Sequence, residues 1–211
     1  STGGPFALTS AQQEIWLGSN LIADASGFTA GAMLVIDGAV DIELLRRSMV
    51  AAFAAADPVH IKIRESADGL IAERGTPPVP VSTVDLSDAA DPEIAAREWI
   101  DADMRVPYDL TEGPLARTAV IVLGPERTLA YLSVHHIVAD GISMATMLSA
   151  VIEAYYRGGT ASPRPLWNAE ALGTADAAYR ESADYAADAA YWQDFVADAP
   201  QAGALCGSSV I

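Results

Sequence analysis

The side chains best suited to chemistry in this sequence form one short cluster. His135 and His136 are adjacent, Asp140 and Gly141 follow, and Ser143 comes next. An imidazole has an unperturbed pKa of about 6.5, so near neutral pH it can take a proton from a nucleophile or hold an amine or hydroxyl in line. The cluster lies between an apolar segment and an amphipathic one, where a strand end meets a helix N-terminus. We therefore predict a catalytic or binding site at this junction.

The members of this cluster are expected to differ in role. Adjacent side chains on extended backbone point to opposite faces, so one of His135 and His136 should be structural and the other functional. Asp140 is placed to hold the loop by accepting backbone amides or by pairing with an arginine. Gly141 allows either positive φ or a close backbone approach. Ser143 is expected to bind substrate by donating a hydrogen bond to developing charge.

Other kinds of site are poorly supported. Two adjacent histidines with an aspartate four residues on give poor zinc geometry, and the sequence holds only three histidines and one cysteine. It contains no glycine-rich phosphate loop and no G-x-S-x-G nucleophile turn. We expect no metal site, and we interpret Cys206 as a small apolar residue rather than a catalytic thiol.

The elements that must position this cluster alternate between helix and strand, which predicts an α/β sandwich. Thr9 with Gln12 forms a capping-box pattern, and Asp41 and Asp91 are further helix starts. Strands are expected at 28–36, 59–63, 70–71, 79–84, 116–123 and 128–134, and helices from Ser10, over 41–53 and 91–104, from Ile142, and as one or two helices within 171–197. The strand at 79–84 should be an edge strand because of its prolines, and His60 should lie on the polar face of its strand.

The composition limits the partners. The chain has 211 residues, and 12 basic against 28 acidic side chains give a net charge of −16, while 51% of the residues are hydrophobic. Such a chain can form a core, but its acidity would repel phosphate backbones and anionic lipids, so nucleic acid and membrane are poor partners. It has neither a long apolar run nor a signal-like N-terminus. We expect a cytoplasmic protein.

Three segments together give a specific resemblance. HHIVADG at 135–141 resembles the HHxxxDG motif of the condensation domains of nonribosomal peptide synthetases and of the wider chloramphenicol-acetyltransferase-like acyltransferases. LTSAQQEIWLG at 8–18 is similar to the family's opening L-T-x-A-Q-x-x-I-W, and VPYDLTEGPLAR at 106–117 is similar to its P-F-D-L-x-x-G-P-L-x-R. AADAAYWQDF at 186–195 resembles a helix that closes the first half of these domains.

The resemblance implies a chloramphenicol-acetyltransferase-like αβ sandwich with a mixed sheet and flanking helices. Residues 8–200 would be its N-terminal lobe and 201–211 a linker or truncated end, with the C-terminal lobe missing and the lobe inactive alone. The activity would be amide formation between a thioester donor and an amine acceptor, each tethered to a carrier protein. The phosphopantetheine arms belong to those carrier proteins, and no cofactor would be bound directly.

Carried over by position, the resemblance implies a role for each residue of the cluster. His136 would be the catalytic or substrate-orienting imidazole, with His135 supporting it. Asp140 would be a structural member of an ion pair, and Gly141 would keep a tunnel open for the pantetheine arm. Whether His136 takes the ammonium proton, stabilises the oxyanion or aligns the amine stays open, although alignment with some base character is preferred.

The chain departs from the family pattern before the second predicted strand. Many members carry R-H-E-x-L-R-T-x-F there, and AADPVHIKI at 55–63 lacks those arginines. The structural arginine that would pair with Asp140 is then Arg64 or Arg117. An arginine-poor A-x-A-D-x-L version is similar to condensation domains near the start of an assembly line, which suggests an acyl or aryl donor.

Two alternatives compete with this interpretation. The residues from His135 to Asp140 also fit the H-x-x-x-x-D pattern of O-acyltransferases, so a soluble enzyme acting on an alcohol is possible, although the acidity of the chain argues against phosphate-bearing substrates. The other alternative is a non-catalytic module that docks carrier proteins, in which the cluster only braces a loop.

Overall fold

The computed structural model describes residues 4–21, 25–67, 69–162 and 168–199. A mixed four-stranded sheet has the order β2-β7-β6-β5, with β2 (Thr29–Asp37), β7 (Arg127–His135), β6 (Ala116–Gly124) and β5 (Val81–Asp85). The first three strands are antiparallel to their neighbours and β5 runs parallel to β6. The expected α/β architecture and the edge position of β5 are both confirmed.

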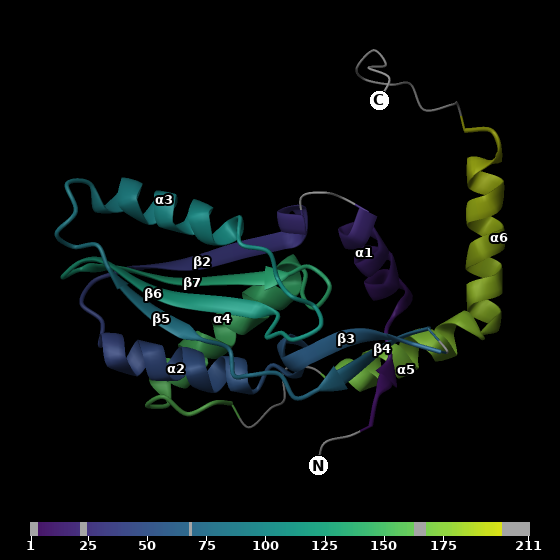
Figure 1. The fold of residues 1–211 in the computed structure, drawn as a ribbon, viewed down its shortest axis with the longest axis horizontal. Helices are drawn as coiled ribbons and strands as arrows, with labels where there is room; N and C mark the ends of the chain where they lie inside the picture. The colour runs from purple at the N-terminus through teal and green to yellow at the C-terminus, as the bar shows by residue number, and fades with distance from the viewer. Residues whose placement is uncertain (1–3, 22–24, 68, 163–167, 200–211) are drawn as a thin grey trace.

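Helices cover both faces of this sheet, as Figure 1 shows. The apolar faces of α2 (Ile42–Ala54) and α4 (Gly141–Tyr156) form the larger core with one face of the sheet, and α3 (Pro92–Met104) covers the other face. Central strand β7 is buried at every position after its first residue, which explains its nearly continuous apolar sequence. Each fully buried large aliphatic side chain stabilises the fold by about 1.5–3 kcal/mol.

A second, antiparallel sheet has the order β1-β4-β3 and lies beside the end of β7. Its strands are β1 (Phe6–Ala7), β4 (Gly69–Arg74) and β3 (Ile61–Ser66), and they are accompanied by α1 (Ser10–Leu21), α5 (Ala169–Arg180), α6 (Ala183–Ala197) and two short 3-10 helices, η1 (Ala25–Phe28) and η2 (Asp57–His60). A small core packs between this sheet and the end of β7, and Ile137 belongs to it. The motif loop is therefore supported by both sheets.

Local sequence signals account for the helix starts. The Thr9 hydroxyl accepts from the amide of Gln12, and the Gln12 side chain accepts from the amide of Thr9, which completes the expected capping box. Asp41 and Asp91 also accept amides of their own first turns. The prediction for His60 is wrong, because it ends η2 and its Nε2 lies 2.8 Å from the carbonyl oxygen of Phe53.

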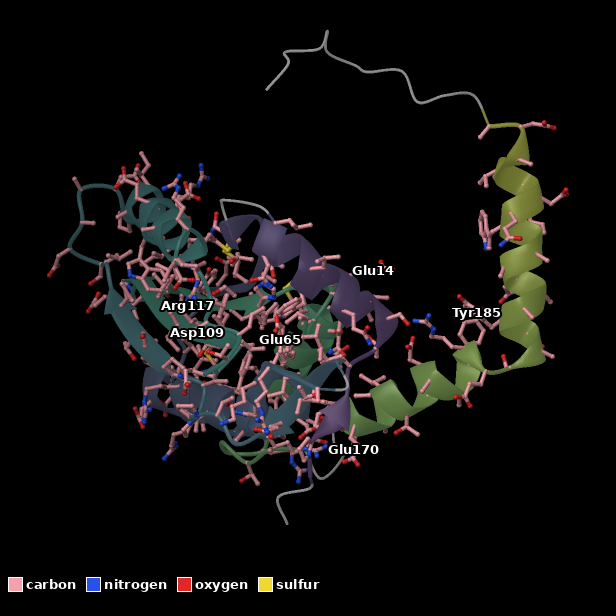
Figure 2. The ribbon with its side chains drawn as sticks, turned by 45° about the vertical axis from the view of Figure 1, so that its right-hand side comes forward. Glu14, Glu65, Asp109, Arg117, Glu170 and Tyr185 are labelled. Atoms are coloured by element: carbon pink, nitrogen blue, oxygen red, sulfur yellow. The ribbon has the colours of Figure 1, made fainter. Side chains whose placement is uncertain are left out.

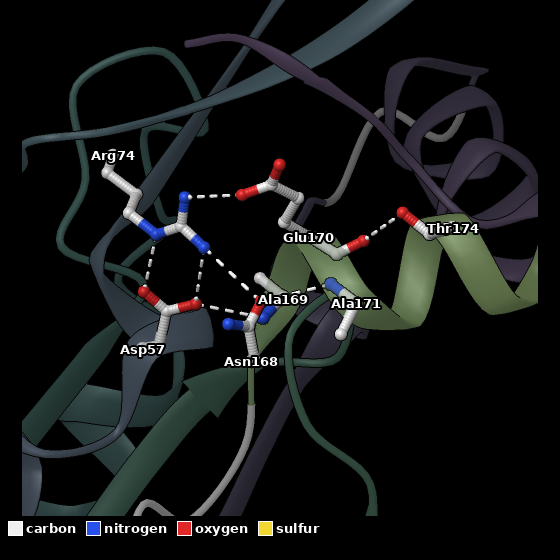
Figure 3. A network of polar contacts seen from close by, with 7 residues as sticks. All are labelled: Asp57, Arg74, Asn168, Ala169, Glu170, Ala171 and Thr174. Atoms are coloured by element: carbon white, nitrogen blue, oxygen red, sulfur yellow. Dashed lines mark hydrogen bonds and ion pairs between the residues drawn. The ribbon is translucent and has the colours of Figure 1, made fainter. Parts of the chain in front are cut away.

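Helix α5 is fastened to the second sheet by charge and by close packing. Figure 3 shows Arg74 bound to Asp57 through two nitrogens, at 2.7 and 3.2 Å, and to Glu170 of α5 at 3.2 Å. The second carboxylate oxygen of Asp57 also accepts the amide of Ala169 at 2.8 Å. No local pattern predicted this network, because Arg74 and Asp57 lie 96 and 112 residues from the α5 residues that they bind.

No helix among the described residues is long and apolar enough to cross a membrane. The segment expected to be a linker, 201–211, and Cys206 lie outside the described residues.

Close packing of α5 on β1 gives a first prediction. A methyl group added at Gly173 would lie 2.2 Å from the carbonyl oxygen of Ala7, which is backbone and cannot move aside alone. We expect Gly173→Ala to lower the free energy of unfolding by about 1–3 kcal/mol, the usual result of overpacking. Chemical denaturation measures it.

The matched control is Gly141→Ala, since a methyl group there meets nothing within 4 Å and the residue is also helical. Its unfolding free energy should stay the same or rise slightly, because alanine favours helix. Equal losses in the two variants would contradict the packing argument.

Candidate active site

The histidine motif occupies the turn between the end of β7 and the start of α4. His135 is the last residue of β7, and its amide donates to the carbonyl of Leu115 at 3.1 Å. The amide of His136 donates to the carbonyl of Phe28 at 2.8 Å, and that of Val138 to the carbonyl of His135 at 3.1 Å. These bonds fix the direction in which the chain leaves the sheet.

His135 is the buried histidine of the pair. It is only 2% exposed, and its ring stacks on Phe28 and meets the edge of Tyr108. Its Nδ1 accepts the amide of Ile137 at 3.2 Å, so the ring hydrogen is on Nε2. Burial, and to a lesser degree the nearby His136, lowers the pKa of His135 to about 4. The imidazole is therefore neutral at physiological pH.

His136 is exposed, on the opposite side of the chain from His135. It lines a groove of about 550 Å³ that is bounded by α1, the motif loop, the first turn of α4 and α5. One histidine of the pair is therefore buried and the other exposed, and the expected division of their roles stays a prediction.

Two side chains hold the walls of this groove through contacts that the sequence did not predict. The Gln12 amide nitrogen donates to the carbonyl oxygen of Ile137 at 3.1 Å, so α1 is pinned to the motif loop. Asp176 accepts from both the amide and the hydroxyl of Ser10, at 3.0 and 2.7 Å, which joins α5 to α1. Gln12 belongs to the opening motif at 8–18, but the sequence predicted only its capping role. Asp176 carried no sequence signal.

Asp140 caps α4. One of its carboxylate oxygens accepts the amide of Ser143 at 2.8 Å and the Ser143 hydroxyl at 2.7 Å. These bonds, with the hydroxyl contributing most, hold the pKa of Asp140 below its usual value. The Ser143 hydroxyl thus gives its hydrogen to the cap, so the expected donation to substrate does not occur in this arrangement.

The expected ion pair of Asp140 is wrong in this structure. Arg64 pairs with Glu73 on the neighbouring strand, and Arg117 pairs with Asp103 at 2.8 Å. Each arginine finds a carboxylate close to its own strand, and Asp140 is satisfied by the free amides of its helix. Both arginines form ion pairs within the fold, and neither pairs with Asp140.

Gly141 is the first residue of α4 and does not have positive φ. No atom lies within 4 Å of the Cβ that a larger residue would carry. Neither the left-handed conformation nor a close backbone approach explains this glycine within the described part of the chain. What this glycine provides is open space at the start of α4.

Among residues 4–21, 25–67, 69–162 and 168–199, no three His, Cys, Asp or Glu side chains are grouped as ligands for a metal ion. The chemistry available at the groove is that of an imidazole beside a helix N-terminus and a carboxylate.

Comparison with known proteins gives a consistent result. The family model described as Condensation domain matches residues 4–206. The chain is 32% identical over 206 residues to a dimodular nonribosomal peptide synthase of Bacillus subtilis (strain 168), covering 95% of this chain and 9% of that protein. It is 29% identical over 209 residues to an isonitrile lipopeptide synthase of Streptomyces coeruleorubidus, covering 97% and 14%.

Solved structures agree. The starter condensation domain of rhizomide synthetase, in a mutant complexed with C8-CoA, superposes with a TM-score of 0.87 at 31% identity, covering 98% of this chain and 48% of that one. The first condensation domain of the calcium-dependent antibiotic synthetase, with a substrate analogue, gives 0.82 at 33% identity, covering 94% and 48%. The chain therefore spans about half the length of these solved domains.

The cap at Asp140 gives a second prediction. Asp140→Ala should lower the free energy of unfolding by about 1 kcal/mol, because the Ser143 amide loses its acceptor. Asp140→Asn keeps an acceptor without the charge, so its unfolding free energy should stay within a few tenths of a kcal/mol of the original. An ion-pair role would instead make Asn as costly as Ala in urea denaturation.

The buried imidazole gives a third prediction, on pH. The pKa of His135 is depressed from 6.5 to about 4 on folding, so the unfolded chain binds a proton there that the folded chain does not. Its contribution to stability is complete above pH 6.5 and is lost as pH falls toward about 4. The slope from one proton reaches about 1.4 kcal/mol per pH unit.

His135→Asn tests this contribution, because its side-chain oxygen replaces the Nδ1 acceptor without titrating. The unfolding free energy of the two proteins should differ in slope between pH 5 and 6.5, while their carboxylates contribute alike. Identical slopes would show that His135 is not held neutral.

Proposed function

Because the chain belongs to the condensation-domain family, we propose that it forms the N-terminal lobe, residues 8–200, of a domain that makes amide bonds in nonribosomal peptide synthesis. The donor is a thioester and the acceptor an amine, each tethered by a phosphopantetheine arm to its own carrier protein. The observation that carries the proposal is the exposed His136 in a groove where the family's opening segment and histidine motif meet.

The reaction asks little of the protein, because a thioester is already activated and a neutral amine is already a nucleophile. The amine nitrogen attacks the thioester carbonyl, a C–N bond forms, and the C–S bond breaks. His136 aligns the amine and takes its proton, which then goes to the departing sulfur, so the donor carrier leaves as a free thiol. Alignment can supply much of the acceleration.

The surroundings of His136 suit this role. Asp140 lies near enough for electrostatic interaction with His136, so a carboxylate is at hand when the imidazole takes a proton. Gly141 leaves open space at the start of α4, directly after Asp140 of the groove wall, which supports the proposed passage of a thin pantetheine arm. His135 stays neutral and adds no second positive charge.

The half of the solved domains that this chain does not span is the proposed cover of this lobe. Helix α6 has no buried residue, and Figure 2 shows it standing away from both sheets with Tyr185 near its junction with α5. Tyr191, Trp192 and Phe195 are 58–66% exposed on it. Tyr191 stacks on Phe195, and the Trp192 ring meets both of them edge to face. A patch of this kind marks an interaction surface. A second lobe that packs here would also enclose the groove.

The donor is proposed to be an acyl thioester. The matching starter domain of rhizomide synthetase was solved with C8-CoA. The arginine-poor segment at 55–63 supports the same assignment for this chain. An acyl-CoA of medium length is therefore a suitable donor probe, with an aminoacyl carrier protein as acceptor.

The fourth prediction concerns His136 in the complete two-lobed domain. His136→Ala should lower the rate of amide formation from acyl-CoA and an aminoacyl carrier protein by about 10²–10⁴-fold, the usual loss for a positioned acid or base. Mass spectrometry of the acceptor carrier measures the product. The matched control is His60→Gln, which keeps a donor near the Phe53 carbonyl, far from the groove, and should leave the rate unchanged.

Two results would contradict the proposal. Undiminished amide formation by His136→Ala would remove the catalytic role. A complete domain that binds both carriers but forms neither amide nor ester would favour the docking-module interpretation, whereas transfer to an alcohol acceptor alone would favour the O-acyltransferase. The isolated lobe should show no turnover, because half a groove cannot hold both substrates.

A further inference from the structure

A buried polar network lies on the face of β7 that α3 covers. Its centre is the carboxylate of Asp103, near the end of α3, whose side chain is 13% exposed. One oxygen accepts from Nε of Arg117 at 2.8 Å. The other accepts two hydroxyls, from Tyr131 and from Ser133, each at 2.8 Å. Burial alone would raise the pKa of Asp103, but the bonds from Arg117, Ser133 and Tyr131 outweigh it and keep the pKa low.

The chemistry of these groups fixes the direction of the hydrogen bonds. An ionised carboxylate only accepts, so Ser133 gives its single hydroxyl hydrogen to Asp103. The Ser133 oxygen, 2.9 Å from the Tyr108 hydroxyl, then accepts from it. Burial raises the pKa of Tyr108 to about 12, so the phenol keeps its proton. The chain of donation runs from Tyr108 through Ser133 to Asp103.

The Tyr108 end of this chain contacts the histidine motif through its ring. The guanidinium of Arg117 lies 4.0 Å from the centre of the Tyr108 ring, and the Tyr108 ring meets His135 at 6.1 Å with an interplanar angle of 83°. Phe28 stacks on His135 at 6.0 Å, so the imidazole is held by two rings. Its Nδ1 accepts the amide of Ile137. Tyr108 thus contacts the imidazole that accepts a backbone amide of the motif loop.

We propose that Tyr108 and Ser133, oriented by Asp103, are positioning residues that hold the His135 imidazole in one place and one tautomer and thereby set the place of His136. The inference rests on the proposed function only where it concerns His136. Tyr108, Ser133 and Asp103 do not line the groove around His136, so they act on His136 through His135. Tyr108 and His135 also line a separate pocket of about 480 Å³.

The network contains its own control. Tyr131 and Ser133 donate to the same oxygen of Asp103 at the same distance, and both are buried. Only Ser133 continues to Tyr108, whereas the Tyr131 ring meets Trp99 of α3. Loss of either hydroxyl weakens the network alike, but only the Ser133 branch leads to His135.

The experiment compares Ser133→Ala, Tyr108→Phe, their double variant and Tyr131→Phe in the complete domain. The first two should each lower kcat by about threefold to tenfold with little change in KM, the loss expected from one hydrogen bond. The double variant should be no worse than the singles, because both cut the same link. Tyr131→Phe should keep its kcat within about twofold, although its Tm falls as much as that of Ser133→Ala.

A second measurement does not depend on activity. In ¹⁵N NMR of the imidazole rings, His135 should give the neutral Nε2–H pattern, and Ser133→Ala and Tyr108→Phe should broaden or shift its signals while Tyr131→Phe leaves them in place. Equal effects of Ser133→Ala and Tyr131→Phe on kcat and on these signals would reduce the network to a structural one and overturn the inference. If His136→Ala stays active but the His135 signals respond as described, the proposed function fails and the positioning of the loop stands.

Discussion

The site is shaped by the need to pair the backbone polar groups of one turn. This turn joins the last residue of β7 to the first turn of α4, and its amides have no partners in a regular helix or sheet. Buried amides are almost always paired. Here the amide of His136 goes to η1, that of Ile137 to a side-chain nitrogen of His135, and that of Ser143 to the Asp140 carboxylate. Apart from His136, the residues of the motif mainly provide the hydrogen bonds that hold this turn. His136 is left with its ring at the surface.

The rest of the lobe supports that turn from several directions. Helix α1 reaches the loop through Gln12, and α5 closes the groove and is tied back to α1 through Asp176. Arg74 and Asp57 in turn hold the start of α5 (Figure 3). Because ion pairs hold α5 against the second sheet, the groove wall gives the His136 ring a fixed place. Preorganisation of this kind lets positioning replace stronger chemistry.

The arginines illustrate how an acidic chain uses scarce positive charge. Arg64, Arg74 and Arg117 each bind a carboxylate within this lobe, and Arg117 also stacks on Tyr108. The acidic groups that remain keep the surface negative, which is unsuited to nucleic acid. The exposed aromatic side chains of α6 form an apolar surface instead. Such a surface fits a chain that spans about half the length of the matching solved domain.

The roles of His135 and His136 stay predictions, although one ring is buried and the other exposed. The sequence did predict most of the helices and strands, the helix starts at Thr9, Asp41 and Asp91, and the family, because these depend on residues within a few positions of one another. It did not reveal that Asp140 caps a helix without pairing with Arg64 or Arg117, that Ser143 gives its hydrogen to that cap, or that Asp103 and Tyr108 lie behind His135. Those arrangements depend on which side chains distant strands and helices bring within 3 Å, since a hydrogen bond goes to the nearest partner in space, and only the packed tertiary structure decides which partner that is.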